Sequence, residues 1–548
     1  MGEECFDQRA VVVAVQNALS APEAIVAEAL RVTTPRGRFQ VRWDESGSAT
    51  ALGQLAFFAE FLEFSGLFER WLEGFPMAYT SPNAPSVRNV LGTWLLSILD
   101  GQRRYAHVTG LRSDGVAPEI LGMCAIISDE SLRRALAHLA PAPKRCSEAK
   151  RLEREARLAQ TGAWMETALS ESIREALWMQ WILDIDTTIK VLYGHQAGAE
   201  VGYNPVKPGR PSHVVHTYWI SGMRLVLDAE VQNGKAIAGC HGLPRLLDIL
   251  GRLPPESRPR LVRGDIGFGV ERIMKELEAI DQPYLFKLRQ SAGVVRLIER
   301  LWKNGDWQDV GAGEQAVEAN LQLMGWTCAR RMVVVRRARQ KPETTVKARA
   351  REAGKGQHRL PFGNSEELAK KLEYAILVTH SDYDLAALGQ LYRDRADCEN
   401  GFDELTNQWG WGGYTTQDLE RCNLSARAVA LIYNWWSWYV RLAHPKTRRE
   451  AITSRPLLLA GVARLIQHAG QSRLLITLTH AAGDQIKAMI ANGRKAFETI
   501  KANAPQLTKP DRWTALVRYI IEKILAAKPR KEPLPALPTL LLPLPDSG

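Results

Sequence analysis

The sequence predicts an α/β protein in which a mixed sheet flanked by helices carries a β-rich insertion and lies between two all-α regions. After Trp178, strand and helix patterns follow one another in the order β-β-β-α-β-α-β. That order is typical of a mixed sheet with helices on its faces. Residues 1–175 and 446–548 are instead predicted to be mainly helical, from helical patterns that include Leu52–Phe75 and residues 450–526.

The composition favours a polyanionic partner. Lys and Arg number 71 against 60 Asp and Glu, which gives a net charge of +11. The seven Cys residues include no CxxC pair, which argues against a disulfide framework and against a structural zinc site. The chain also has no signal-peptide core and no run of 18 apolar residues, so we expect a cytoplasmic protein with access to DNA.

Residues 1–175 are predicted to be a mainly helical, DNA-binding region. Helices are expected within Leu52–Phe75 and Ser86–Leu99, and Ser128 is a candidate N-cap before a third helix. Residues 141–175 read as one long charged helix. Short capped helices with basic residues are compatible with a helix-turn-helix unit, and equally with a purely structural α domain.

The predicted first part of the catalytic core, residues 176–290, opens with a β-branched strand at Trp181–Leu192. Asp184 and Asp186 are two residues apart and therefore point to one face of this strand. A carboxylate buried among Ile and Leu is costly unless a partner binds it. An antiparallel meander is expected to follow, with strands at His213–Ile220 and Arg224–Val231.

The next predicted strand, Arg260–Asp265, ends in an aspartate within a glycine-rich loop. A helix before it, a helix after it and a last strand complete the core pattern: Leu243–Leu253, Val270–Ile280 and Tyr284–Leu288. Ligands gather at strand ends in sheets of this kind, which makes Asp265 a candidate site residue.

Residues 291–380 are predicted to be the β-rich insertion, with short strands at Asp306–Val310, Leu321–Ala329, Arg330–Arg339 and Tyr374–Thr379. Arg336, Arg337 and Arg339 lie along the most basic of these strands. Basic side chains on a β ribbon suit a phosphate backbone, whereas the alternative is a solvated charged hairpin.

The second part of the core, residues 381–445, contains a predicted helix from Gly389 to Leu405. Its helical spacing places Tyr392, Arg395, Glu399 and Phe402 on one face, with Arg395 four residues before Glu399. By itself this is also the pattern of an ordinary surface ion pair. A second helix, Leu419–Leu442, carries tryptophans that we interpret as packing, and the chain ends in a Pro/Leu-rich tail at Pro529–Pro545.

Two aspartates on separate strands and a glutamate on a later helix are what a two-metal phosphoryl-transfer site requires. Carboxylate oxygens suit Mg²⁺ or Mn²⁺, and two such ions stabilise both the attacking and the leaving oxygen. The sequence contains no P-loop, HExxH, GxSxG or dinucleotide-binding glycine motif.

Three motifs resemble those of the DDE transposases of bacterial insertion sequences, whose catalytic domain is RNase H-like. Asp186-Thr-Thr188 resembles the first-aspartate motif, and Arg263-Gly-Asp-Ile-Gly-Phe268 the second. Tyr392 to Phe402 is similar to the Tyr-Arg-Glu signature around the catalytic glutamate. The interval from Asp265 to Glu399 is long enough for the β-rich insertion of the cut-and-paste group, and the resemblance covers roughly residues 86–440.

This resemblance implies metal-dependent hydrolysis at transposon ends, followed by attack of the freed 3′-hydroxyl on target DNA. Asp186, Asp265 and Glu399 would hold two Mg²⁺ or Mn²⁺ ions, and Tyr392 and Arg395 would orient Glu399 and contact DNA. The implied partners are terminal inverted repeats and target DNA, bound by a homodimer.

The resemblance also implies a tryptophan in the insertion that receives a flipped base. Trp326 is our candidate. Trp302 and Trp307 are rivals, and packing is an alternative role for each of the three.

The chain departs from the family at one position, because Thr406 stands where the signature ends in Lys. Asp184 is a possible substitute for Asp186, and Asp397 and Glu404 lie off the helical face of Glu399. Two other functions remain open: an RNase H-like nuclease that cuts without joining, and an inactive or domesticated relative that only binds DNA.

Overall fold

The computed structural model describes residues 30–77, 79, 81–143, 147–205, 207–338, 372–411, 413, 416–477 and 480–527. Arg339 and the Pro/Leu-rich tail lie outside the described residues. The chain forms two compact units, residues 1–47 and residues 48–548. The first unit contains an antiparallel hairpin, β1 (Leu30–Thr34) and β2 (Gly37–Val41), where the sequence predicted mainly helix.

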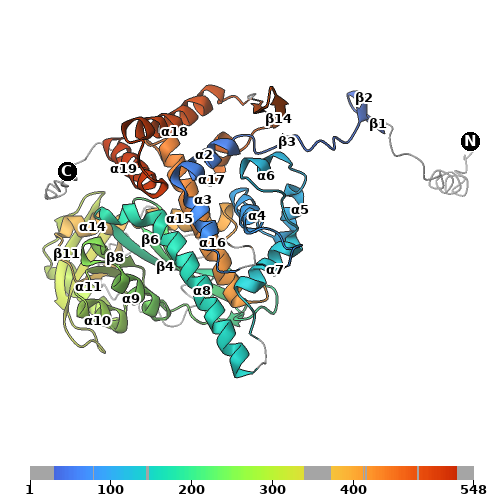
Figure 1. The fold of residues 1–548 in the computed structure, drawn as a ribbon. Coiled ribbons are helices and arrows are strands. Elements are labelled where there is room, and N and C mark those ends of the chain that lie inside the picture. Colours follow the sequence, from blue (N-terminus) through green and yellow to red (C-terminus); the bar gives the residue numbers. More distant parts are fainter. Residues whose placement is uncertain are drawn as a thin grey trace, which may run out of the picture. The chain divides into compact units, whose positions relative to one another are not determined.

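The second unit is built on a 10-stranded mixed sheet with the strand order β10-β11-β12-β13-β9-β8-β4-β6-β5, in which β7 also pairs with β6 (Figure 1). Its strands are β4 (Ile182–Val191), β5 (Glu200–Val201), β6 (Pro211–Ile220), β7 (Leu225–Asn233), β8 (Leu261–Gly264), β9 (Tyr284–Lys287), β10 (Gln308–Asp309), β11 (Glu314–Leu321), β12 (Arg330–Ala338) and β13 (Leu372–Thr379).

The centre of this sheet has the arrangement that the sequence predicted. Strands β4, β6 and β7 form the antiparallel meander, and β8 and β9 run parallel to β4 on its other side. The resulting order β7-β6-β4-β8-β9 is consistent with an RNase H-like sheet. The predicted fold class, a large mixed sheet with flanking helices, is therefore confirmed.

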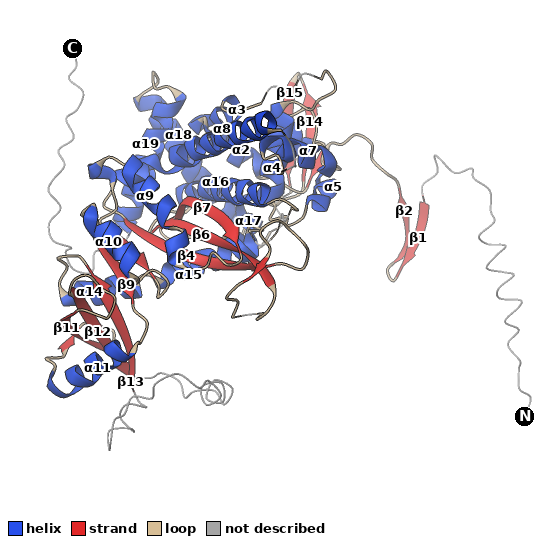
Figure 2. Ribbon diagram, turned by 90° about the horizontal axis from the view of Figure 1, so that it is seen from below, coloured by secondary structure: helices blue, strands red, loops and turns tan. Residues whose placement is uncertain are grey.

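The insertion extends the same sheet, because β13 pairs with β9 in antiparallel register (Figure 2). One predicted strand is wrong. The strand covers Glu314–Leu321 and not Leu321–Ala329, which instead holds a turn closed by a hydrogen bond from Trp326 N to Leu323 O at 3.0 Å. Gly325 has a positive φ of 89° in this turn, a conformation that interrupts a strand.

Helices cover the sheet and bury its apolar residues. α16 (Leu419–Ala443) packs against β7 and against the long helix α8 (Glu148–Ile173). Trp435, Trp436 and Trp438 are all buried within it, in agreement with their interpretation as packing residues. Further helices near the sheet are α9 (Leu243–Arg252), α10 (Glu271–Ala279) and α11 (Ala292–Asn304).

The region before the core is helical, as predicted. Ser86 and Ser128 cap their helices by accepting hydrogen bonds from the backbone N–H groups of Asn89 and Ser131. Gly66, with φ of 68°, divides the predicted Leu52–Phe75 helix into two. The helices are α2 (Leu55–Ser65), α3 (Leu67–Glu73), α4 (Val87–Leu99), α5 (Val108–Leu111), α6 (Val116–Ile120) and α7 (Asp129–Leu139).

The C-terminal region is not entirely helical, so the all-α prediction there is wrong. It contains α17 (Ala451–Leu458), α18 (Gly483–Asn503) and α19 (Lys509–Ala527), but also a hairpin. β14 (Ala463–His468) and β15 (Gln471–Ile476) form this hairpin, and β14 pairs with β3 (Ala49–Thr50). Ala469 and Gly470 both have positive φ in its two-residue turn, which matches the twist of paired strands. Among the described helices, none is long and apolar enough to cross a membrane.

Candidate active site

The centre of the sheet brings the predicted aspartates together. Asp184 of β4 lies directly beside Arg263 of the parallel strand β8, and Ile185 lies beside Gly264. Because side chains alternate along a strand, Asp186 and Asp265 project from the same face at the next position. Asp265 is half-buried, and its Oδ1 accepts a hydrogen bond from Gly267 N at 2.9 Å, which orients the carboxylate.

The predicted Gly389–Leu405 helix is wrong in one respect, because it is two helices. α14 (Leu385–Arg393) and α15 (Ala396–Gln408) are separated by Asp394 and Arg395. Hydrogen bonds of the i to i−3 type tighten the chain here, from Arg395 N to Tyr392 O at 3.2 Å and from Asp397 N to Asp394 O at 3.2 Å. Tyr392 therefore closes α14, and Glu399 lies in the first turn of α15, where the helix dipole favours a negative charge.

Arg395 joins two of the predicted site carboxylates. Its Nη1 donates to Glu399 Oε1 at 3.2 Å, so the predicted ion pair is present, and its Nη2 donates to Asp186 Oδ1 at 3.0 Å. The Arg395 side chain is only 6% exposed, whereas Glu399 is 66% exposed. A buried guanidinium therefore bridges a half-buried aspartate and a largely exposed glutamate.

The charges of Asp265 and Glu399 both act on Asp186. Burial raises the pKa of Asp186 to about 6; the charge of Arg395 opposes this effect, and the charges of Asp265 and Glu399 add to it. Burial also raises the pKa of Tyr392, and Asp265 and Glu399 act in the same direction on this phenol. Tyr392 is therefore a protonated hydrogen-bond donor at neutral pH.

The donor chemistry of this cluster suits a divalent cation, but its geometry does not yet form a metal site. Within the described residues, no group of three His, Cys, Asp or Glu side chains is arranged to hold an ion. Arg395 lies between Asp186 and Glu399 and neutralises both. Asp186, Asp265 and Glu399 offer the hard oxygen atoms that Mg²⁺ prefers, and an ion bound there would have to replace the contacts of Arg395 with Asp186 and Glu399.

Sequence reasoning missed the role of Arg263. Its Nε and Nη2 donate to the two oxygens of Asp184 at 2.6 and 2.7 Å, and its Nη2 also donates to Ser221 Oγ at 2.7 Å. A further bond runs from its Nη1 to the Leu391 carbonyl of α14. Arg263 thus connects the two central strands, the hairpin turn and the helix of Tyr392. A signal was present, because Asp184 lies in an apolar strand and needs a buried cation.

The other acidic residues near Glu399 have structural partners. Asp184 forms an ion pair with Arg263, so its carboxylate is not available to replace Asp186 as a metal ligand. Asp397 pairs with Arg224, and Glu404 pairs with Arg448.

The predicted DNA-contacting residues of the insertion have local partners. Arg336 lies 3.9 Å from the ring centroid of Trp307 and donates to Gln315, and Arg337 pairs with Glu373 at 3.0 Å. The charge of Arg337 nevertheless acts against the burial that raises the pKa of Tyr392, so this end of β12 lies near the candidate active site.

The predicted base-binding tryptophan also has a partner. Trp326 is half-buried in its turn, with the guanidinium of Arg330 at 5.1 Å from its ring centroid. Trp302, Trp307 and Trp326 all pack against the hydrophobic core, which is the alternative role considered for each of them.

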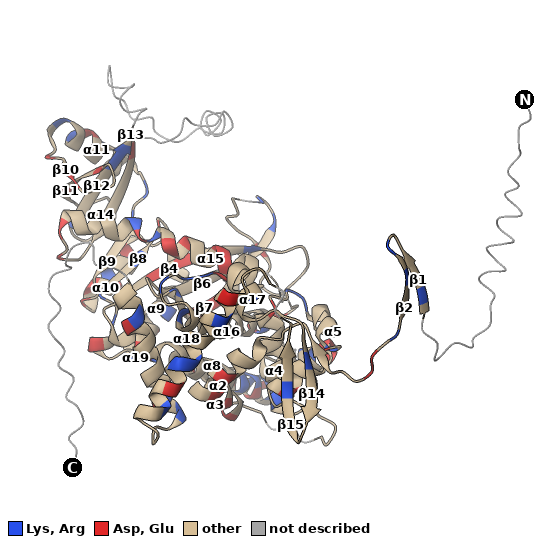
Figure 3. Ribbon diagram, turned by 90° about the horizontal axis from the view of Figure 1, so that it is seen from above, with Lys and Arg blue, Asp and Glu red and all other residues tan. Residues whose placement is uncertain are grey.

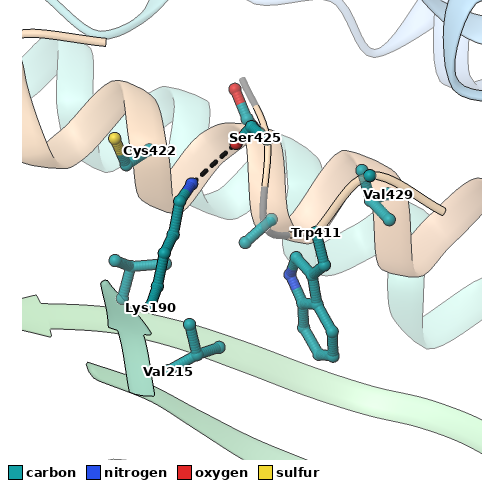
Figure 4. Close-up of a pocket in the computed structure, with 10 residues that line it drawn as sticks. Lys190, Val215, Trp411, Cys422, Ser425 and Val429 are labelled. Carbon is teal, nitrogen blue, oxygen red and sulfur yellow. Dashed lines mark hydrogen bonds between the residues drawn. The ribbon is translucent and has the colours of Figure 1, made fainter. Parts of the chain in front are cut away.

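A small cavity lies between α16 and strands β4, β6 and β7, and the half-buried Lys190 donates from Nζ to the carbonyl of Gly413 at 2.6 Å beside it (Figure 4). Burial lowers the pKa of Lys190. The cavity measures about 10 Å³, which is at most the size of one water molecule. We therefore exclude it as a substrate site.

A family model described as a transposase DDE domain matches residues 178–435. Residues 178–435 are therefore similar in sequence to a transposase DDE domain. The matched segment begins just before β4 and ends inside α16, so it contains Asp186, Asp265, Glu399 and the insertion.

Among solved structures, the chain has a likeness to a piggyBac transposase in a synaptic complex with hairpin DNA, with 13% identity and a TM-score of 0.36. That alignment covers 89% of this chain and 88% of the other. No curated protein sequence matches.

Proposed function

We propose that this protein is a DNA transposase that cleaves transposon ends and joins them to target DNA in a metal-dependent reaction. The observation that supports this proposal best is the arrangement of Asp186, Asp265 and Glu399 around Arg395 within a DDE domain. The negative charges of Asp265 and Glu399 both raise the pKa of Asp186, and a divalent cation bound among these groups would relieve that repulsion.

In the proposed reaction, Asp186, Asp265 and Glu399 would hold two Mg²⁺ or Mn²⁺ ions. When bound, such ions activate the attacking oxygen and stabilise the leaving oxygen of the phosphodiester. Arg395 holds the carboxylates of Asp186 and Glu399 in place through its two hydrogen bonds, and its guanidinium group would be available to a DNA phosphate if ions took over these contacts. Tyr392 donates a hydrogen bond from its neutral phenol to the same backbone.

The substrates that we propose are the terminal inverted repeats of an insertion sequence and a double-stranded target. Arg336, Arg337, Arg339 and Trp326 are the proposed contacts of the insertion with DNA. Since two ends have to be joined to one target, we propose a homodimer on DNA. A bacterial cytoplasmic origin fits this proposal.

The test uses purified protein and end-labelled DNA from the flanks of its own gene, with Mg²⁺ or with EDTA. Wild type is compared with Asp265→Asn and with the matched control Asp281→Asn, whose side chain is fully exposed at the turn before β9. We expect Mg²⁺-dependent cleavage at a discrete end, lost in Asp265→Asn and kept in Asp281→Asn, together with joined products.

Other outcomes separate the alternatives. Cleavage without joined products identifies an RNase H-like nuclease, which overturns strand transfer but not the site. Tight DNA binding without cleavage in Mg²⁺ or Mn²⁺ identifies an inactive relative and overturns the proposal.

A further inference from the structure

The hairpin of the first unit has two chemically different faces. Leu30 pairs with Val41 and Val32 pairs with Phe39, and these four side chains are 38% to 50% exposed. Because side chains alternate along a strand, all four lie on one face. The next pairs, Arg31 with Gln40 and Thr33 with Arg38, form the opposite face.

Arginines dominate this second face and the turn. Arg31 and Arg38 lie on it, Arg42 follows β2 with the same parity, and Arg36 occupies the turn. All four are exposed, and residues 30–43 contain no Asp or Glu. Within the described part of the chain, none of the four forms an ion pair with a carboxylate. We call Arg31, Arg36, Arg38 and Arg42 the arginine face, and Figure 3 shows basic residues on this hairpin.

The turn holds the arginines in place. Pro35 fixes its own φ, and the Thr34 side chain closes the loop by donating to Gly37 O at 3.1 Å and accepting from Arg36 N at 3.3 Å. Gly37 has φ of 128°, a conformation that other residues rarely adopt. Arg36 therefore lies in a turn of defined geometry, and Arg38 follows that turn directly.

We propose that residues 30–43 form a two-stranded ribbon whose arginine face binds duplex DNA. The inference rests on the proposed function in taking DNA as the polyanion. The major groove of B-DNA, about 12 Å wide, admits a two-stranded β-ribbon, whereas the major groove of A-form RNA is too narrow for side chains to read. Guanidinium groups suit phosphate oxygens and base edges, since their donors match both in a bidentate way.

The experiment measures binding of the full-length protein to a labelled 25-base-pair duplex by fluorescence anisotropy, in EDTA and between 50 and 200 mM NaCl. The test variant replaces all four residues of the arginine face by Gln, and a second variant replaces them by Lys. The matched control removes four exposed cations from the C-terminal region by substitution with Gln: Arg464, Arg473, Lys487 and Lys495.

Each phosphate contact contributes about 0.9 to the slope of log K against log salt concentration. We therefore expect this slope to become shallower by about 3 in the Gln variant. In the Lys variant the slope should change little if the contacts are to phosphates. In the control variant it should stay within about 1 of the wild-type slope. Circular dichroism melting checks that the Gln variant is folded. A slope unchanged in the Gln variant overturns the inference, as does an equal loss in the control.

Competition identifies the partner. Excess unlabelled duplex DNA should displace the probe at a lower concentration than double-stranded RNA or phosphatidylserine vesicles, and the reverse order overturns duplex DNA as the ligand. Binding in EDTA does not depend on cleavage. If the protein binds DNA through the arginine face but never cleaves it, only the proposed function is refuted. If the protein cleaves DNA normally and the Gln variant keeps the wild-type salt slope, only DNA binding by the arginine face is refuted.

Discussion

Asp184 and Arg263 form a bidentate ion pair between adjacent parallel strands, with side-chain exposures of 0% and 1%. The two residues are direct register partners, two positions before Asp186 and Asp265 on their strands. The buried pair therefore fixes the register that brings the two outer aspartates side by side, and it explains why a carboxylate is present in an apolar strand.

Replacing Arg263 by Met should destabilise the protein by about 3–5 kcal/mol, because it leaves the Asp184 carboxylate buried without a partner. Urea unfolding followed by tryptophan fluorescence measures this loss. The double variant Asp184→Leu, Arg263→Met should recover a large part of it, since no charge then remains to be buried.

The control for this prediction is Arg134→Met. Arg134 pairs with Glu130 on the surface, with exposures of 73% and 59%, so the loss there should stay below about 1 kcal/mol. A loss at Arg263 that is no larger than the loss at Arg134 contradicts a structural role for the buried pair.

In the proposed metal site, Arg395 and the ion would compete for the carboxylates of Asp186 and Glu399. Replacing Arg395 by Gln removes a positive charge within 3.0 Å of Asp186 and 3.2 Å of Glu399, so Mn²⁺ should bind about tenfold more tightly to the DNA-free protein. Electron paramagnetic resonance of free Mn²⁺ measures the affinity.

Arg393→Gln is the matched control for the Mn²⁺ measurement, because Arg393 carries the same charge two residues earlier but is bound to Glu314. Its Mn²⁺ affinity should equal that of wild type. Weaker Mn²⁺ binding in Arg395→Gln would show that Arg395 aligns the ligands more than it competes with the ion.

His216 should make stability depend on pH. Burial lowers the pKa of His216 to about 4, against about 6.5 in the unfolded chain. Between these values the unfolded state binds a proton that the folded state does not. The free energy of unfolding is therefore highest above pH 6.5. It falls by about 3 kcal/mol as the pH falls towards 4.

Urea unfolding at pH 7.5 and at pH 4 tests the role of His216. The variant His216→Gln keeps a donor for the Ala236 carbonyl, to which His216 Nε2 lies 2.8 Å away, but cannot titrate. It should lose less stability than wild type on acidification, whereas His468→Gln, at an exposed position of β14, should follow wild type. Parallel curves for wild type and His216→Gln would contradict the assignment.

The sequence predicts those features that depend on alternation and order along the chain. The β-branched run at Ile182–Val191 with two same-face aspartates, the meander after it and Asp265 at a strand end all follow from local patterns. The Ser128 cap is likewise local, because its oxygen binds a backbone N–H three residues away.

Features that depend on tertiary contact are absent from such patterns. The bond of Arg395 to Asp186 joins residues 209 positions apart, and only folding brings them together. The break at Asp394 and Arg395 keeps helical φ values, so residue propensities do not indicate it. The β14–β15 hairpin was missed because its turn, Ala469-Gly470, lacks the Asn-Gly or Asp-Gly sequence that usually indicates one.

Gly401 permits the close approach of the Glu399 helix to the sheet. A Cβ at this position would lie 2.4 Å from the ring of Trp219, which is fully buried between Phe402 and Tyr433 and has no room to move. Gly401→Ala should therefore destabilise the protein by about 1–3 kcal/mol through overpacking, and the displacement of α15 should weaken Mn²⁺ binding at Glu399.

Gly162→Ala is the matched substitution in α8, where an added Cβ meets nothing within 4 Å. Because alanine favours a helix interior over glycine, that variant should be more stable than wild type by up to about 1 kcal/mol. Opposite shifts of the two thermal midpoints are the expected result of calorimetry. If Gly401→Ala were also stabilised, α15 and β6 would have to lie further apart than this structure places them, and Glu399 would be correspondingly further from Asp186.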